Sequence, residues 1–374
     1  MLALSAAAAD TSPALLDFTP EERARILSHG PWPVATAPDA GNRVQDRPAA
    51  VAWGRTLFFD AGLSASGRVS CASCHVPARA FQDGVPTARV DADTAQPGRR
   101  NTPSLLDAAQ HRWLGWDGAH DSLWAASLAP LLAPDEMGQS APALASRLRG
   151  HAASRASYRR AFGRPMPRDD ERLVVDVAKA LAAYQATLRS PRTPFDDFRD
   201  ALQRGRLRAA AAYPMAAQRG LRIFIGHGRC SVCHAGPTFT NGEFADIGVP
   251  FFVPGGVDPG RHGGLQQLQA SRMNRLGSYS DGGQQDPRAV TTRHVLIEPR
   301  HFGEFRVPGL RHLTHTAPYM HNGSLATLED VVQHYSALNE DRLHADGERI
   351  LRRLNLTAEQ AADLATFLRS LSLR

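Results

Sequence analysis

The sequence predicts a mostly α-helical protein built from two related domains, with long loops and little β-structure. Apolar residues recur at helical spacing in several segments, whereas the alternation typical of strands is scarce. A short apolar segment occurs twice, at residues 54–59 and 220–225, and each copy precedes a cysteine motif. The 374 residues are enough for two domains, each with its own core.

The composition is that of an ordinary folded protein and excludes several classes. Hydrophobic residues make up 43% and charged residues 21%, which argues against disorder. No apolar run is long enough to span a membrane, and four cysteines are too few for a disulfide scaffold. The net charge of +6 comes from arginines spread along the chain, with Lys179 as the only lysine, so we expect no nucleic-acid partner.

The N-terminal region is expected to lie outside the two domains. Its first ten residues are rich in alanine and resemble either the end of a truncated secretory signal peptide or a disordered tail. Proline and glycine then punctuate residues 30–50, which predicts an irregular wrap. We therefore assign residues 1–48 to an N-terminal tail.

The predicted domain boundary follows a clear helical segment. Residues 172–184 place Leu173, Val177 and Leu181 at helical spacing, and prolines interrupt the chain soon afterwards. This pattern places the first domain at residues 49–200 and the second at residues 201–374.

The second domain is predicted to combine a long loop with two terminal helices. Residues 250–300 are rich in glycine, glutamine, arginine and aspartate and show little periodicity, which predicts a long functional loop. Thr327 and Thr357 each precede an apolar stripe at helical spacing and can cap a helix.

Two CxxCH motifs account for all the cysteines: Cys71, Cys74 and His75, then Cys230, Cys233 and His234. This pattern attaches haem c, because two thiols on one turn can form thioethers with the haem vinyl groups while the histidine binds the iron. The alternatives are a zinc site joining both CxxC pairs, which would leave the histidines unexplained, and a thioredoxin-like dithiol. We expect two covalent haems and, since haem c is assembled outside the bacterial cytoplasm, a periplasmic protein.

The remaining axial ligands decide what the two haems can do, because an iron with an open distal face can bind peroxide. After His75 no histidine occurs before His111, so the first haem is predicted to be five-coordinate, with a ligand from a distant segment as the alternative. For the second haem, Tyr335 lies on the apolar face of a predicted helix and would bind iron as an anionic phenolate. An ordinary core tyrosine and a Met320 ligand are the alternatives.

Six motifs make the chain resemble the di-haem cytochrome c peroxidase family, and within it the branch of MauG-like and MbnH-like proteins. The resemblance covers roughly residues 49–374. The motifs are Ser70-Cys-Ala-Ser-Cys-His75, Gly98-Arg-Arg-Asn-Thr-Pro103, Gly115-Trp-Asp-Gly118, Pro134-Asp-Glu-Met-Gly138, Arg306-Val-Pro308 and Thr316-Ala-Pro-Tyr-Met-His-Asn-Gly323.

This resemblance implies roles for four side chains. Trp116 matches a tryptophan that relays electrons between the haems, and Glu136 matches a distal glutamate that assists peroxide cleavage. Pro130 matches a proline over the first haem. Tyr335 falls where the peroxidases place an axial methionine and the MauG-like branch an axial tyrosine.

The resemblance also implies a calcium ion between the haems. Asn101, Thr316 and Pro318 match its ligands, the last two through their backbone carbonyls. The chain departs from the family at Ala126, where many members have a distal glutamine. It also departs at Gly228, where MauG has a surface tryptophan through which its protein substrate is oxidised.

These features predict an enzyme that uses hydrogen peroxide to form a high-valent di-haem state. That state would oxidise a tryptophan or tyrosine of a partner protein at a distance and so modify it. The similarity to MbnH-like enzymes implies a copper-binding partner. The alternatives are a di-haem peroxidase that reduces peroxide to water with electrons from a small redox protein, and a pure electron carrier with both irons six-coordinate.

Overall fold

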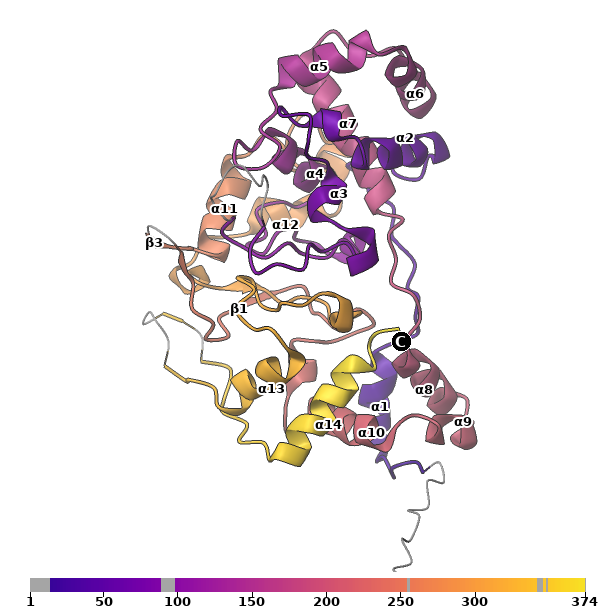
Figure 1. Ribbon diagram of the computed structural model, residues 1–374, viewed down its shortest axis with the longest axis vertical. Coiled ribbons are helices and arrows are strands. Elements are labelled where there is room, and N and C mark those ends of the chain that lie inside the picture. Colours follow the sequence, from indigo (N-terminus) through magenta and orange to yellow (C-terminus); the bar gives the residue numbers. More distant parts are fainter. Residues whose placement is uncertain (1–13, 89–97, 254–255, 342–345, 348, 374) are drawn as a thin grey trace, which may run out of the picture.

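The computed structural model describes residues 14–88, 98–253, 256–341, 346–347 and 349–373, so the predicted signal-peptide remnant lies outside the described residues. The prediction of a mostly α-helical fold is confirmed (Figure 1). The α-helices are α1 (Pro20–Ser28), α2 (Pro48–Phe58), α3 (Cys71–Cys74), α4 (Leu123–Leu132), α5 (Ala141–Gly150), α6 (Ala152–Phe162), α7 (Asp170–Gln185), α8 (Pro194–Gln203), α9 (Leu207–Ala211), α10 (Met215–Ile225), α11 (Arg261–Ala270), α12 (Ala289–His294), α13 (Leu328–Ser336) and α14 (Ala358–Arg369).

The β-structure of the described residues is slight, as predicted. Two antiparallel pairs of two-residue strands are present, and one of them joins distant parts of the second half of the chain. The strands are β1 (Phe244–Ala245) paired with β4 (Phe305–Arg306), and β2 (Phe252–Val253) paired with β3 (Gly256–Val257).

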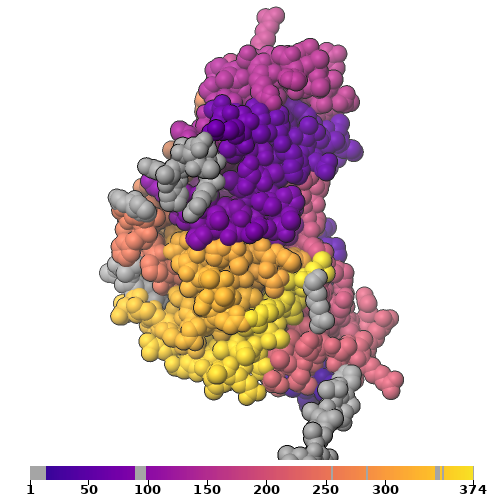
Figure 2. All heavy atoms as spheres, viewed as in Figure 1, coloured from indigo at the N-terminus to yellow at the C-terminus, as the bar shows by residue number. Residues whose placement is uncertain are grey.

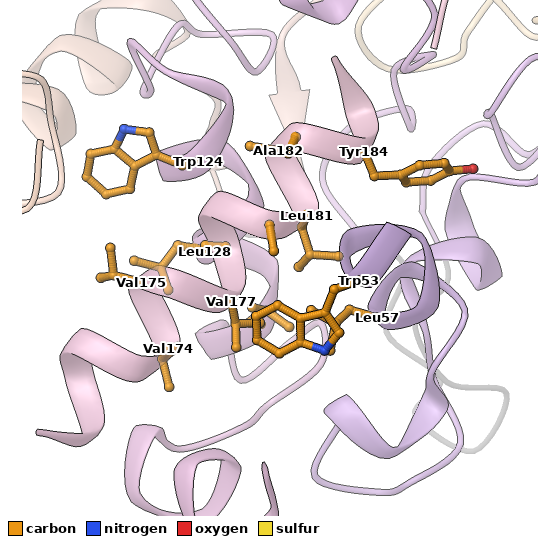
Figure 3. Close-up of a cluster of buried hydrophobic side chains, with 14 of the residues drawn as sticks. Trp53, Leu57, Trp124, Leu128, Val174, Val175, Val177, Leu181, Ala182 and Tyr184 are labelled. Carbon is orange, nitrogen blue, oxygen red and sulfur yellow. The ribbon is translucent and has the colours of Figure 1, made fainter. Parts of the chain in front are cut away.

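The helices form two groups, which lie one above the other in Figure 1 and adjoin on the face shown in Figure 2. The upper group surrounds a hydrophobic core in which Trp53 and Leu57 of α2 lie near Val177 and Leu181 of α7 (Figure 3). The lower group surrounds a second core built from α8, α10, α13 and α14. α1 packs in this lower group against α8 and α10, although it is the first helix of the chain. The predicted boundary near residue 200 stays a prediction.

Three helices predicted from periodicity and caps are confirmed. α7 buries the predicted apolar residues and is capped by Asp169. Thr327 and Thr357 begin α13 and α14 with reciprocal capping boxes formed with Asp330 and Gln360. These helices were predictable because their caps and apolar stripes are local in the sequence.

The repeated segment predicted at residues 54–59 and 220–225 lies in α2 and α10, and each helix crosses a later helix at a glycine. A Cβ at Gly54 would collide with the carbonyl oxygen of Ala180 in α7, and one at Gly220 with that of Asp363 in α14. Both crossings therefore depend on close backbone approach, which a larger residue would prevent. The shared geometry shows that the repeat extends beyond sequence similarity.

The prediction of a long loop at residues 250–300 is wrong in part, because this segment contains α11 and α12. Helical periodicity is weak in α11, since glycines and glutamines occupy much of its length and few of its residues are buried. The segment returns to the upper helix group, where the buried Arg275 donates to the carbonyl oxygen of Asp121 (2.8 Å). Polar contacts of this kind leave no apolar pattern in the sequence.

The N-terminal segment between α1 and α2 has no helix or strand and lies against the body of the protein, whereas α1, within the predicted tail, packs in the lower group. The buried Trp32 donates its indole N–H to the carbonyl oxygen of Ser190 (3.0 Å), and Asn42 donates to that of Lys179 (2.9 Å). These contacts hold the wrap against the body of the protein. None of the described helices combines the length and apolar character needed to cross a membrane.

Two segments, residues 101–130 and 306–335, follow the same backbone path at a constant separation in the sequence. Left-handed residues, a short β-bridge, a 3₁₀ turn and a capped helix occur in both, in the same order. The matching features are Asp107 with His312, Gly118 with Gly323, the bridge Leu114–His120 with Tyr319–Leu325, the turn Ala108–Gln110 with Leu313–His315, and the caps Ser122 with Thr327.

Within these two segments, each residue of 101–130 has a counterpart 205 positions later in 306–335. Pro130 of α4 corresponds to Tyr335 of α13, and Gly115 corresponds to Met320. Gly115 and Met320 both have positive φ, at 80° and 74°.

Candidate active site

The first CxxCH motif forms a short helix that brings its two thiols and histidine together. Ser70 and Ser73 cap α3 reciprocally, and the backbone N–H of His75 donates to the carbonyl oxygen of Cys71 (2.9 Å). The Nδ1 atom of His75 lies 3.0 Å from the carbonyl oxygen of Phe81, which can only accept a hydrogen bond. Nδ1 therefore carries the proton, and the lone pair of Nε2 is left for a metal ion.

The second CxxCH motif repeats this arrangement. The backbone N–H of His234 donates to the carbonyl oxygen of Cys230 (2.9 Å), and Nδ1 of His234 lies 3.0 Å from the carbonyl oxygen of Phe239. Phe81 and Phe239 both adopt positive φ, which turns their carbonyls toward the histidines. Burial lowers the pKa of both His75 and His234, so both rings are neutral and suited to bind iron.

The structure does not support a zinc site shared by the two CxxC pairs. All four cysteines are free, and among the described residues no three His, Cys, Asp or Glu side chains converge on one point. Zinc sites need converging thiolates.

A cavity of about 690 Å³ extends from the second CxxCH motif toward the first helix group. Its volume is in the range of cofactor sites. Every residue predicted for the second haem or for the region between the haems lines it. These residues are Cys230, Cys233, His234, Tyr335, Met320, Trp116, Asn101, Thr316 and Pro318.

Arg306 shows that this cavity fits a haem group. It is buried, and burial lowers its pKa to about 10, so it keeps its charge at neutral pH. Its Nε donates to the carbonyl oxygen of Gly115 (3.1 Å), while its Nη1 has no hydrogen-bond partner among the described residues. A buried unpaired guanidinium nitrogen is costly, and a haem propionate is the kind of anion that would satisfy it.

Tyr335 and Met320, the two candidate ligands for the second iron, both line this cavity. Burial raises the pKa of the Tyr335 phenol, and the neighbouring thiols of Cys230 and Cys233 raise it further. The phenol therefore lies near the CxxCH motif that would hold the haem, and both line the same cavity.

At the first centre, the counterparts of both candidates lack a donor side chain. Tyr335 corresponds to Pro130 and Met320 to Gly115, and neither proline nor glycine can bind iron through its side chain. The two centres therefore differ in chemistry although their backbones match.

Glu136 lies beside the first CxxCH motif, just after α4. Burial raises the pKa of the Cys74 thiol to about 11, and the charges of Asp83 and Glu136 add to that rise. The Glu136 side chain is exposed, yet the protein atoms around its carboxyl group raise its pKa, with a smaller contribution from Asp135. A carboxyl group with a raised pKa is suited to accept and return a proton.

Trp116 joins the two helix groups. Its indole N–H donates to the carbonyl oxygen of Asn101 (2.8 Å), and its own carbonyl oxygen accepts from the backbone N–H of Arg306 (2.7 Å). Asn101 in turn donates its backbone N–H to the carbonyl oxygen of His321 (2.7 Å). The predicted relay residue is thus held by hydrogen bonds to both groups.

Sequence reasoning missed Arg306 and His321 as parts of this site. Both belong to motifs that carried the resemblance, but no role followed from the motifs alone. His321 is buried and its ring stacks on that of Phe305, with the centroids 3.5 Å apart. A phenylalanine follows each motif histidine at a similar distance, six residues after His75 and five after His234. This was the available signal for the carbonyl groups that orient the two histidines.

Comparison with known proteins agrees with this geometry. The sequence profile of the family described as di-haem cytochrome c peroxidase matches residues 48–204. The chain is 34% identical over 324 residues to the methylamine utilization protein MauG of Methylorubrum extorquens, covering 87% of this chain and 78% of that protein. It is 32% identical to the cytochrome-c peroxidase IdrP1 of Denitromonas iodatirespirans, covering 92% and 86%.

Two solved structures share the fold. One is a MauG-like protein associated with microbial copper homeostasis, with a TM-score of 0.68, 26% identity and coverage of 92% of this chain and 95% of that one. The other is the diheme peroxidase BthA of Burkholderia thailandensis, with a TM-score of 0.69, 25% identity and coverage of 91% and 87%.

Proposed function

Because this chain belongs to the di-haem cytochrome c peroxidase family, which includes MauG, we propose that it uses hydrogen peroxide to oxidise an aromatic residue of a partner protein. The family consists of peroxide-using di-haem oxidoreductases, so the chain is an enzyme of the peroxidase class that binds two haem c groups. The proposed oxidation of a partner protein rests on one observation. The second centre has Tyr335 at a position where the first centre has Pro130.

The two haems are assigned to equivalent sets of residues. Cys71 and Cys74 would bind the first haem covalently with His75 as its only protein ligand. Cys230, Cys233 and His234 would hold the second together with the Tyr335 phenolate. When bound, the haem irons supply the site of peroxide reduction and store the oxidising equivalents.

Glu136 would move the proton during peroxide cleavage. Its carboxylate accepts a proton from one peroxide oxygen and returns it to the other, so that water leaves. Pro130, the counterpart of Tyr335, has no side-chain atom that could bind the iron of the first haem, so this iron would stay available to peroxide. Peroxide takes up two electrons and two protons and becomes two molecules of water.

Trp116 would carry electrons between the two centres. Its hydrogen bonds to Asn101 and Arg306 hold the indole between the helix groups, and it lines the same cavity as Tyr335. Oxidising equivalents would then leave toward a tryptophan or tyrosine of the partner. That partner is proposed to be a copper-binding protein because the similar MauG-like structure is associated with copper homeostasis.

We also assign a calcium ion to the region between the haems. Asn101, Thr316 and Pro318 line one cavity and can present oxygen atoms, the ligands that calcium prefers. The protein is proposed to act in the periplasm, where haem c is attached.

A second candidate function is reduction of peroxide to water with electrons from a small redox protein. Met320 favours it, because this side chain lines the same cavity as Tyr335 and a methionine ligand gives a haem a high reduction potential. The similar IdrP1 protein is also named a cytochrome-c peroxidase.

Mass spectrometry of a candidate partner distinguishes the two functions. The haem-loaded enzyme is mixed with peroxide and a candidate copper-binding partner protein, and the partner is then digested. We expect an added oxygen or a cross-link at a tryptophan or tyrosine of the partner. If the partner is unmodified but the enzyme consumes peroxide rapidly with a reduced small cytochrome, the second function is supported. The Glu136→Gln variant, which lacks the proposed base, is the control that shows whether oxidation depends on the enzyme.

A further inference from the structure

The four tryptophans other than Trp116 are all buried, yet their surroundings differ. Trp32, Trp53, Trp113 and Trp124 expose 3%, 4%, 3% and 0% of their surface. Cations lie over three of these indoles: Arg311 over Trp32 at 3.8 Å, Arg261 over Trp113 at 4.3 Å and Lys179 over Trp124 at 5.6 Å. Among the described residues no cation lies over Trp53 or Trp116.

Of these three cations, only Arg261 has no ion pair among the described residues, although the more distant charges of Asp117, Glu243 and Glu304 raise its pKa. Arg311 pairs with Asp196 (2.8 Å) and Lys179 with Asp281 (2.7 Å). Arg261 instead donates Nη1 to the carbonyl oxygens of Gly118 (3.0 Å) and Asp117 (3.3 Å), and in the described part of the chain no carboxylate is near enough to form an ion pair with it.

The guanidinium of Arg261 is also held tightly. Only 3% of the residue is exposed, and its Cζ lies 4.3 Å from the ring centroid of Trp113 and 4.0 Å from that of Phe244. Burial lowers the pKa of Arg261 to about 10, so the charge persists at neutral pH.

Trp113 is the tryptophan nearest to the proposed relay Trp116 in the sequence, so it could donate an electron to an oxidised Trp116. It precedes Trp116 by three residues, which limits the distance between their Cα atoms to about 11 Å. A positive charge over an indole stabilises the neutral ring and destabilises its radical cation, because like charges repel strongly in a buried site. Electron transfer from Trp113 to an oxidised Trp116 is therefore disfavoured while Arg261 is in place.

We propose that Arg261 is a positioning residue that keeps oxidising equivalents on Trp116 by making its neighbour Trp113 harder to oxidise. This inference rests on the proposed function, in which Trp116 relays those equivalents. Without the charge, Trp113 would be consumed in self-oxidation. In that reaction an indole C–H becomes C–OH while hydrogen peroxide is reduced to water, so that RH and H₂O₂ give ROH and H₂O.

Two substitutions separate the charge of Arg261 from its packing. The haem-loaded full-length chain carrying Arg261→Met or Arg261→Lys is treated with peroxide without a partner, and oxidised tryptophans are located by peptide mass spectrometry. We expect oxidised Trp113 to rise about tenfold in Arg261→Met and to stay within about twofold of wild type in Arg261→Lys. Trp53, with no cation over it, should be unchanged in both.

Equal oxidation of Trp113 in the two variants, or none in a correctly folded Arg261→Met chain, overturns the proposal. Circular dichroism and the haem absorption bands establish folding.

A measurement on the unchanged chain needs neither variant nor peroxide. Dibromide radical anions, made by pulse radiolysis, take one electron from an indole and become two bromide ions. The oxidised indole releases its N–H proton to water and becomes a neutral indolyl radical. Trp113 and Trp53 are equally buried, so we expect at least about threefold less oxidation at Trp113. Equal oxidation of Trp113 and Trp53 overturns the proposed shielding of Trp113 by Arg261. If Trp113 is oxidised less than Trp53 but the enzyme does not react with peroxide, the proposed function has failed and the shielding has not.

Discussion

At the scale of single residues, the site depends on a few side chains whose pKa values the protein shifts. Glu136 has a raised pKa because protein atoms surround its carboxyl group and Asp135 lies close. Tyr335 has a raised pKa because it is buried beside the second CxxCH motif. An iron ion would reverse the effect on Tyr335, since coordination stabilises the phenolate.

Replacing Glu136 should abolish most peroxide-dependent oxidation. We expect Glu136→Gln to lower kcat/KM for peroxide by roughly 100-fold or more, because the glutamine amide cannot accept the proton. In the unchanged enzyme the rate should fall as the pH drops through the raised pKa of Glu136, since the base becomes protonated. Stopped-flow kinetics over a range of pH tests both points, and a pH profile shared by the variant would contradict the assignment.

The stability of that variant separates catalysis from folding. A carboxyl group whose folded-state pKa lies above its unfolded value destabilises the fold when it ionises, so its cost is present above the folded-state pKa and absent below the unfolded value. Glu136→Gln should therefore be at least as stable as the original chain at neutral pH, as thermal unfolding would show.

Replacing Tyr335 should alter one haem and leave the other unchanged. We expect Tyr335→Phe to change the absorption and electron paramagnetic resonance spectra of the second haem alone, because the phenolate ligand is lost. Tyr319→Phe is the matched control, since Tyr319 lines the same cavity but donates its hydroxyl to the carbonyl oxygen of Leu313 (2.8 Å). Identical spectra for Tyr335→Phe and the original chain would favour Met320 as the ligand.

At the scale of secondary-structure elements, the repeated helix crossing is the feature on which both cores depend. α2 packs against α7, and α10 packs against α14, with a glycine at each closest approach. The sequence repeat at residues 54–59 and 220–225 was visible beforehand, but the partners of these glycines were not. A glycine reveals nothing about which backbone it approaches until the helices are packed.

Adding a methyl group at either crossing should destabilise the protein. We expect Gly54→Ala and Gly220→Ala each to lower the free energy of unfolding by about 1–3 kcal/mol, because the new Cβ overlaps a backbone carbonyl. Gly150→Ala, also in a helix, has open space around it and should change stability by less than about 1 kcal/mol, in the stabilising direction. Urea unfolding of the haem-loaded protein distinguishes these outcomes.

At the scale of the whole molecule, buried charges hold the segment at residues 250–300 against the first helix group and the N-terminal wrap. Arg275 exposes little surface and contacts both Asp39 of the wrap (2.6 Å) and Asp286 (2.7 Å). Its Nε also donates to the carbonyl oxygen of Asp121 (2.8 Å). One guanidinium thus connects three parts of the chain that are far apart in sequence.

Removing this guanidinium should loosen that connection. We expect Arg275→Met to cost about 3–5 kcal/mol, because it leaves two buried carboxylates unpaired. Arg352→Met is the surface control, since Arg352 and its partner Glu340 are largely exposed and the pair should contribute less than about 1 kcal/mol. Hydrogen exchange should show faster opening of α11 and α12 in Arg275→Met, and unchanged exchange there would contradict the role of Arg275.

The sequence by itself determined the haem-attachment motifs, the mostly helical class and helices α7, α13 and α14, because each depends on neighbours within a few turns of the chain. It did not reveal α11 and α12, whose contacts are polar and distant. Only the tertiary structure decided that Pro130 corresponds to Tyr335, that Arg306 has an unpaired nitrogen in the cavity and that Arg261 covers Trp113. Those relations join residues brought together only by packing, and no local pattern of residue types encodes them.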